Sequence, residues 1–223
     1  MTDRADIPER LRRFAERNWP EGATATRVVF SQAGEIRMRP NGRWLPFSAE
    51  QWIATRSPAF CWHARVKMAP LVTAVVEDAF EEGHGRLDVK MFGALPVTHA
   101  EGPSVDRGEL QRYLAELPFA PGAILHDREL RFADGPEGSV RVWISDPEIH
   151  VDLHFDEDGD VTRTFSETRP RGDEGPTPWE GRFSVYEETD GLRVPRRAEV
   201  AWLLDGEPFR YFWAELDDFA LEG

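Results

Sequence analysis

Cysteine and histidine stand close together in the segment FCWHARVKM at residues 60–68. Cys61 is the chain's only cysteine, and His63 follows two positions later. A thiol becomes a nucleophile when a neighbouring base or cation stabilises its thiolate, so this pair could serve covalent catalysis. The segment alternates between apolar and polar residues, which predicts a β-strand with both side chains on its polar face. Residues two apart on a strand point in parallel, and no third group orients the imidazole, so we expect no catalytic role for this pair.

Imidazole and carboxylate side chains alternate in the segment EIHVDLHF, at Glu148, His150, Asp152 and His154. Both groups are good ligands for zinc or iron. On a strand these four residues share one face, and at most two of them could reach the same metal ion. We therefore expect a solvated polar face and no metal site.

A second candidate is an acidic stretch whose carboxylates match positions 1, 3, 5 and 12 of an EF-hand calcium loop, at Asp156, Asp158, Asp160 and Glu167. Position 6 of such a loop requires glycine for its sharp turn, and here it is Val161. Gly159 instead suits a hairpin turn between two strands. We expect no calcium site.

The remaining catalytic and cofactor motifs are absent from the sequence. It has no phosphate-binding glycine-rich loop, no G-x-S-x-G and no CxxC pair. We expect no cofactor, and no catalytic residue can be named from the sequence.

The 27 Lys and Arg residues against 41 Asp and Glu give an acidic protein with a net charge of -14, which repels nucleic acid and anionic lipid surfaces.

The expected location is the cytoplasm. A lone cysteine forms no internal disulfide, and residues 1–20 contain no apolar run of the kind a signal peptide needs. No stretch approaches the ~18 to 20 apolar residues of a membrane-spanning helix. We therefore expect a protein that does not span a membrane. The sequence does not identify a protein partner.

Two helices are expected to position any site. The first lies within residues 1–20, where Asp6 and Glu9 form a capping-box pair and Ile7, Leu11 and Phe14 form an apolar stripe.

The second expected helix spans residues 106–117, with a capping-box pair at Asp106 and Glu109. It has one apolar stripe, made by Leu110, Tyr113, Leu114 and Leu117. This stripe must cover part of a sheet.

Most of the remaining chain has the period of two that is typical of strands, separated by turn pairs such as Asn41-Gly42 and Asp190-Gly191. The strands near residues 198–204 and 209–216 are apolar on both faces, which indicates cover on both sides. We predict an α+β, mostly β protein with one domain at residues 21–223 and the N-terminal helix packed on it.

Several stretches resemble a known family. They are FGALPVTHAEGPSVDRGELQRYLAELPFAPGAIL (92–125), GRWLPFSAEQ before it and TPWEGRFSVYEETDGLRVPRRAEVAW after it. They resemble an uncharacterised bacterial family, common in actinobacteria, of the LolA/LolB-like lipoprotein-carrier superfamily. The resemblance implies an open, strongly curved antiparallel sheet, a half-barrel wrapped around plug helices, with an apolar cavity and the helix at 106–117 as a plug or cap.

This fold leads to the functional prediction that the protein binds an apolar small molecule or lipid in the concavity of the sheet. Large aromatic and aliphatic side chains shape such pockets. The candidate ligand-binding residues are Trp44, Phe47, Trp62, Leu110, Tyr113, Leu114, Leu117, Trp143, Trp202, Tyr211 and Trp213. If Leu114 faces a hollow, a larger side chain there should occupy it.

Two alternatives remain open. One is a cofactor-free enzyme that acts on a hydrophobic metabolite in the same cavity, with polar residues at its mouth such as His99, Glu101, Tyr113 and His126. A polar residue on an otherwise apolar inward face would favour it. The other is a structural or partner-binding role through an exposed sheet edge.

Overall fold

The computed structural model describes residues 6–223, apart from the side chain of Asp173. The first half of this range contains helix α1 (Glu9–Asn18), then the strands β1 (Arg27–Ile36), β2 (Leu45–Ala54), β3 (Phe60–Ala69), β4 (Val72–Glu81), β5 (His84–Met91) and β6 (Leu95–Glu101). Helix α2 (Pro103–Ala115), the 3-10 turn η2 (Leu117–Phe119) and helix α3 (Pro121–His126) follow.

The second half is built almost entirely from strands. These are β7 (Leu130–Asp134), β8 (Val140–Ile144), β9 (His150–Phe155), β10 (Val161–Pro170), β11 (Pro176–Thr189), β12 (Leu192–Leu204) and β13 (Glu207–Glu222). Two short 3-10 turns, η3 (Pro136–Gly138) and η4 (Gly172–Glu174), lie in the connections.

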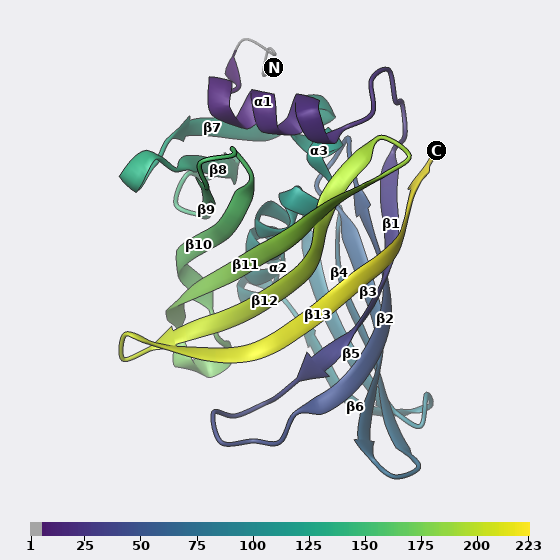
Figure 1. Cartoon of the computed structure of the whole chain (residues 1–223). Helices are drawn as coiled ribbons and strands as arrows, with labels where there is room; N and C mark the ends of the chain where they lie inside the picture. The colour runs from purple at the N-terminus through teal and green to yellow at the C-terminus, as the bar shows by residue number, and fades with distance from the viewer. Residues whose placement is uncertain (1–5) are drawn as a thin grey trace.

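Within residues 6–223, thirteen strands form a single antiparallel sheet in the order β6-β5-β4-β3-β2-β1-β13-β12-β11-β10-β9-β8-β7. The chain therefore makes two meanders that join where β1 pairs with β13. The sheet curls around its own concave side (Figure 1). Its two edge strands, β6 and β7, stay unpaired with each other, so the predicted open, curved half-barrel is confirmed.

The alternation of residues along each strand decides which side chains enter the concave side. In β3, Phe60, Trp62, Ala64 and Val66 are buried, and the residues between them are at least partly exposed. β2 shows the same period. This is the pattern expected when one face of a sheet packs on a core and the other faces water.

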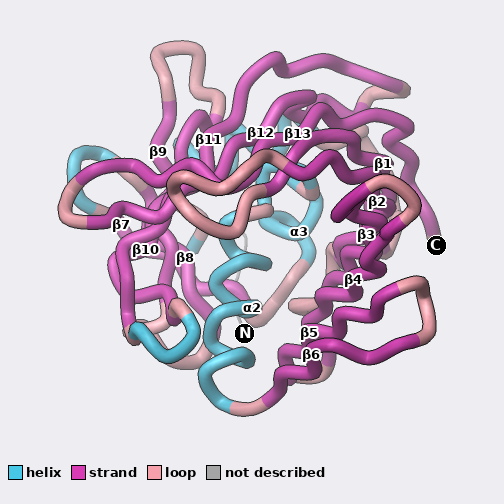
Figure 2. The backbone as a smooth tube through the Cα atoms, turned by 90° about the horizontal axis from the view of Figure 1, so that it is seen from below, coloured by secondary structure: helices cyan, strands magenta, loops and turns pink. Residues whose placement is uncertain are grey.

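Helix α2 lies inside the curve of the sheet and bridges its two halves (Figure 2). It packs against β4, β5 and β6 on one side and against β9 and β10 on the other. Gly85 permits the close approach to β5, because a Cβ at that position would lie 2.7 Å from the carbonyl oxygen of Val105. The backbone N–H of Gly85 also donates to the Asp106 carboxylate at 2.7 Å.

The start of α2 differs from the sequence prediction. The helix begins at Pro103 after Gly102, ends at Ala115, and has no side-chain cap. The capping box of Asp106 and Glu109 was therefore wrong. Proline suits the first helical position, because its fixed φ is already helical and the N–H it lacks would have no partner there.

Helix α1 also lacks the predicted capping box. Pro8 precedes it, no side chain caps it, and Glu9 pairs instead with Arg12 and Arg13. Leu11 and Phe14 are buried as predicted. The ring of Phe14 packs edge-on against Phe155 and Tyr186, so this helix closes one end of the sheet.

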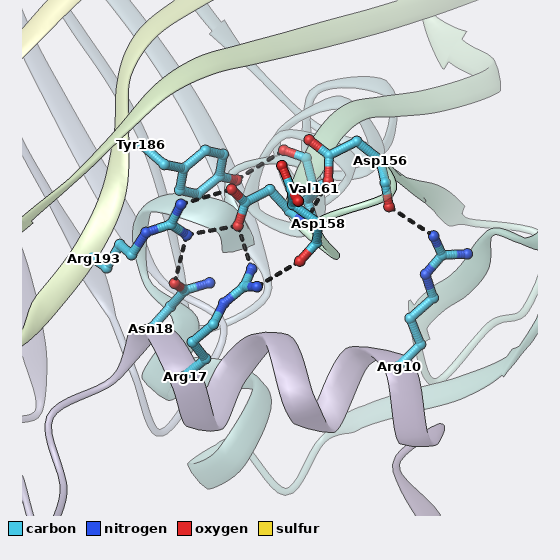
Figure 3. A network of polar contacts seen from close by, with 9 residues as sticks. Arg10, Arg17, Asn18, Asp156, Asp158, Val161, Tyr186 and Arg193 are labelled. Carbon is cyan, nitrogen blue, oxygen red and sulfur yellow. Dashed lines mark hydrogen bonds and ion pairs between the residues drawn. The ribbon is translucent and has the colours of Figure 1, made fainter.

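Polar contacts fix α1 to the turn between β9 and β10 (Figure 3). Asp160 accepts hydrogen bonds from both terminal nitrogens of Arg193, at 2.6 and 2.8 Å, and pairs with Arg17. Arg17 also donates to the carbonyl oxygen of Asp158 at 2.6 Å, and Arg10 donates to that of Asp156 at 3.0 Å. The acidic stretch at residues 156–160, weighed above as a calcium loop, therefore holds α1 against the sheet.

The outer face of the late strands is not fully covered. Ala201 is buried, but Leu203 and Trp213 remain partly exposed. The Trp213 indole donates to Glu35 on the neighbouring strand at 3.1 Å. The expectation of cover on both sides was therefore wrong here, because Leu203 and Trp213 stay in contact with solvent.

Candidate functional site

A cavity of about 140 Å³ lies between α2 and the concave face of the sheet. Strands β1, β3, β4 and β10 to β13 contribute to its wall. Six aromatic side chains line it: Trp62, Phe119, Trp179, Phe183, Tyr211 and Phe212. Gly181 keeps part of the space open, because a Cβ there would lie 2.8 Å from the hydroxyl oxygen of Thr164.

Arg169 brings a positive charge into this aromatic wall. Its Cζ lies 4.3 Å from the ring centroid of Trp179. The Trp179 indole donates to the hydroxyl oxygen of Tyr211 at 3.1 Å, which fixes the orientation of the ring. A cation over an indole face is stabilised by the ring's negative face, most strongly where water is excluded.

A second arginine, Arg112 on α2, has strong partners. Its Nη1 donates to Asp78 at 2.5 Å, and its Nε donates to Glu116 at 2.8 Å. Its Cζ also lies 4.8 Å from the ring centroid of Phe60. The nearby carboxylates raise the pKa of Arg112, so this residue is a permanent cation whose charge is balanced.

Two buried amide side chains, Gln51 and Gln32, link Glu116 to Trp62 by hydrogen bonds. Gln51 donates to Glu116 at 2.5 Å and accepts from Gln32 at 2.7 Å. Gln32 in turn accepts from the Trp62 indole at 3.2 Å. Because these groups are satisfied by one another, they fix the positions of Trp62 and Arg112 beside the cavity.

Glu109 is the weakly paired carboxyl group of the site. Its Oε1 lies 3.4 Å from Nη2 of Arg169. Burial, the negative charge of Asp78 and a hydrogen bond with Asp78 together raise its pKa to about 8, while the charges of Arg169 and Arg112 oppose the shift. Glu109 is therefore mostly protonated at neutral pH.

Two buried polar atoms around this cluster have no hydrogen-bond partner among the described residues. They are Nη1 of Arg169 and the hydroxyl oxygen of Thr164. Buried polar groups are normally satisfied by protein or water. The cationic donor of Arg169 can receive an acceptor such as a carboxylate oxygen.

The structure brings four of the sequence-predicted aromatic residues to this region. Trp62 and Tyr211 line the cavity. Trp202 stacks on Tyr211 with ring centroids 6.0 Å apart, and Phe47 packs behind Trp62 at 5.6 Å.

Three other predicted aromatics lie elsewhere. Trp44 lies under the guanidinium of Arg37 at 4.6 Å, near the start of β2. Trp143 lies between the buried Val142 and Ile144 of β8 and so points to the opposite face. Trp213, on the outer face, contacts Glu35.

The predicted residues of the α2 region are divided between two environments. Tyr113, Leu114 and Leu117 are fully buried in the packed core outside the cavity lining. The Tyr113 hydroxyl donates to Asp127 at 2.9 Å. Leu110 is partly buried and lines a separate surface groove near the connection between β2 and β3.

The residues weighed for chemistry lie away from the cavity. His99 is on exposed strand β6, where it pairs with Asp88 at 2.8 Å and with Glu101 at 3.5 Å. Cys61 is on the outer face of β3, and burial raises the pKa of its thiol, with a further contribution from Glu77. His126 packs edge-on against Trp19.

The two candidate metal segments are engaged in protein contacts. Asp152 is buried and forms a bidentate pair with Arg141, at 2.8 and 2.9 Å. Asp160 binds Arg193 and Arg17. In the described part of the chain, no group of three or more His, Cys, Asp or Glu side chains is arranged to hold a metal ion.

Comparison with known families decides the classification. The model of a family of unknown function, DUF6544, matches residues 1–214. The chain belongs to the DUF6544 family. No curated protein is similar to it in sequence.

Solved structures show that this DUF6544 chain has a LolA-like fold. A LolA superfamily protein from Nitrosomonas europaea superposes with a TM-score of 0.53 at 10% identity, covering 98% of this chain and 94% of the other. A DUF1329 family protein from Desulfovibrio piger gives 0.50 at 10% identity, covering 96% and 90%. A domain from Vibrio parahaemolyticus, assigned by inference to outer membrane lipoprotein sorting, gives 0.53 at 7% identity, covering 98% and 93%.

None of the helices within residues 6–223 combines the length and the apolar character needed to cross a membrane.

Sequence reasoning missed the charged part of this DUF6544 site. Gln32, Gln51 and Asp78 interrupt inward faces that are otherwise apolar, and this interruption is a signal visible in the sequence. Asp78, for example, lies between the inward residues Val76 and Phe80. Arg169 gives no such signal, because arginines are frequent along the strands of the second half.

Proposed function

We propose that this protein binds an apolar small molecule or lipid with a carboxylate-like end, held at Arg169 in the concavity. The observation that carries the proposal is the unpaired Nη1 of the buried Arg169 beside an aromatic cavity. An acceptor at this point would satisfy the arginine. The LolA-like fold, whose relatives include a domain assigned to lipoprotein sorting, supports an apolar cargo.

The apolar part of the ligand extends from the charged cluster along the aromatic wall. Small-molecule sites usually measure ~300 to 1,000 Å³, so a space of about 140 Å³ takes in only part of such a ligand. Ile36 and Tyr211 line the cavity where β1 ends and β13 begins, and in this proposal the apolar tail of the ligand leaves the cavity there. The cytoplasm remains the proposed location.

The test compares two ligands with the same tail. Dodecanoate and dodecanol are titrated into the protein, with the intrinsic tryptophan fluorescence and the heat of binding as readouts. The wild-type protein should bind dodecanoate at least about tenfold more tightly than dodecanol, since a charge-assisted hydrogen bond contributes ~1.5 to 3 kcal/mol.

Arg169→Met should remove the preference for the acid and leave binding of the alcohol unchanged. Arg163→Met is the matched control, because Arg163 is on the same strand, lies 4.6 Å from the ring of Phe165 and pairs with Glu180 outside the cavity. If neither ligand binds, or if both variants lose the acid equally, the proposal is wrong.

A further inference from the structure

One end of the sheet carries three neighbouring hairpin turns. In an antiparallel meander the turns alternate between the two ends, so the β1–β2, β3–β4 and β5–β6 connections emerge together (Figure 1). The six strands that they join are adjacent in the sheet. We refer to residues 37–44, 65–76 and 89–98, which include these turns, as the hairpin end.

Large apolar side chains are exposed on all three turns of the hairpin end. Leu71 is 98% exposed, Met38 72%, Phe92 67% and Leu95 62%. Most other apolar residues of this size are buried or half-buried. Exposed apolar residues gathered at one place indicate a contact surface, unlike single ones scattered over a protein.

The backbone gives a second reason to regard these side chains as selected. Leu71 has a φ of 65° and Phe92 a φ of 53°, in the left-handed region that favours Gly, Asn and Asp. The nearby turn between β12 and β13 uses Asp205-Gly206, the polar pair expected for such a turn. Leucine and phenylalanine disfavour the positive φ of these turns, and they expose apolar surface to water. A contact made by these side chains would explain their presence.

The charge of the hairpin end is opposite to that of the whole protein. Residues 37–44, 65–76 and 89–98 contain no Asp or Glu, although the chain has 41 of them and a net charge of -14. Lys67 and Lys90, the only lysines in the sequence, both lie here, together with Arg39 and Arg43. All four are exposed, and none forms an ion pair with another described residue.

We propose that the hairpin end docks on an anionic lipid surface. The apolar tips enter the boundary between headgroups and acyl chains, while the lysine and arginine side chains reach the phosphate groups. The rest of the acidic protein is repelled by the same surface, so the charge distribution fixes the orientation. This inference does not rest on the proposed ligand, but Ile36, which lines the cavity, directly precedes the first of these turns.

Cosedimentation with vesicles tests the proposal. The wild-type protein should bind vesicles of phosphatidylcholine mixed with phosphatidylglycerol at low salt and should not bind phosphatidylcholine alone. Binding should be lost at about 0.5 M salt, where charges on the surface are screened within a few Å.

The first variant removes the apolar tips without harming the turns. Asparagine tolerates positive φ, so Leu71→Asn with Phe92→Asn should keep or raise the melting temperature. The bound fraction should fall by about tenfold or more, because two buried apolar side chains are lost from the interface.

The second variant reverses the charges. Lys67→Glu with Lys90→Glu should lower vesicle affinity by about tenfold or more, since each basic residue near an anionic surface contributes about fivefold. Arg13→Glu with Arg56→Glu is the control of equal charge change, because both residues are exposed and lie in α1 and the β2–β3 connection, away from the hairpin end. This control should retain most of the binding.

Amine acetylation provides an independent readout on the unmodified protein. Acetylation of Lys67 and Lys90, followed by mass spectrometry, should slow in the presence of the anionic vesicles and not with phosphatidylcholine. Absence of binding at low salt, or an equal loss in the Arg13 and Arg56 control, would overturn the proposal. The proposal would also be overturned if the protein formed dimers without lipid and the Leu71→Asn, Phe92→Asn variant did not. That result would assign the hairpin end to contact with a second copy of the chain.

Discussion

The guanidinium of Arg169 lies over the indole of Trp179, with Cζ 4.3 Å from the ring centroid, and its nearest carboxylate oxygen, on Glu109, is 3.4 Å away. The buried guanidinium of Arg169 therefore packs on an aromatic ring, and its only carboxyl partner within the described residues, Glu109, is at a long distance. Arg112, by contrast, has two short carboxylate contacts. This difference makes Arg169 the cation that is available to a ligand.

Glu109 predicts a pH dependence of stability. Its pKa is about 8 in the folded chain and near the ordinary value of 4.5 when the chain is unfolded. Unfolding between these values releases a proton, so the stabilisation is fully present below pH 4.5 and is lost as the pH rises through about 8. Glu109→Gln should flatten this part of the curve, which amounts to a few kcal/mol by linkage. Urea unfolding at a series of pH values measures it, and parallel curves for the two proteins would contradict the assignment.

Neighbouring positions on α2 should respond differently to larger side chains. Leu114 is fully buried in packed core, so Leu114→Trp should destabilise the protein by ~1 to 3 kcal/mol or more through overpacking. Ala115 lines the cavity, so Ala115→Leu should fill it, leave the melting temperature within a few degrees and weaken dodecanoate binding by about tenfold. Thermal melts and ligand titrations distinguish the two. The opposite pattern would mean that Leu114 faces the hollow.

The attachment of α1 depends on one carboxylate. Asp160→Asn should lower the free energy of unfolding by ~1.5 to 3 kcal/mol, because the hydrogen bonds to Arg193 and Arg17 lose their charge. Asp158→Asn is the control, since Asp158 contributes its backbone carbonyl to Arg17. Denaturant unfolding of both variants checks this, and equal losses would show that the turn itself, rather than the Asp160 carboxylate, is responsible.

Cys61 should prove dispensable. Its thiol has a raised pKa, so it is less ionised at neutral pH than a free cysteine and should react slowly with iodoacetamide. Cys61→Ser should leave ligand affinity unchanged and stability within ~0.5 to 1 kcal/mol. A variant that stays folded and loses dodecanoate binding would show that the outer face of β3 contributes to function.

The period of residues along the chain predicted much of the local structure. The alternation in FCWHARVKM placed Phe60 and Trp62 inside and Cys61 and His63 outside, because a strand has only two faces. The ends of α2 were predicted less well. Asp106 and Glu109 have the spacing of a capping box, but Asp106 receives the N–H of Gly85 and Glu109 is drawn into the interior.

The sequence pattern by itself determined that most of the chain forms strands, many of them with one apolar face, since periodicity and turn residues act over a few positions; the curvature of the sheet was implied by the family resemblance. Only the tertiary structure decided which residues form the site. Arg169 and Glu109 meet across 60 positions of sequence, and Trp179 joins them from a third element, because the curvature of the sheet brings β10 against α2 and β11 pairs with β10. The hairpin end follows the same rule, since Lys67 and Lys90 are distant in sequence and come to the same end of the sheet because their strands both pair with β4, which no local pattern encodes.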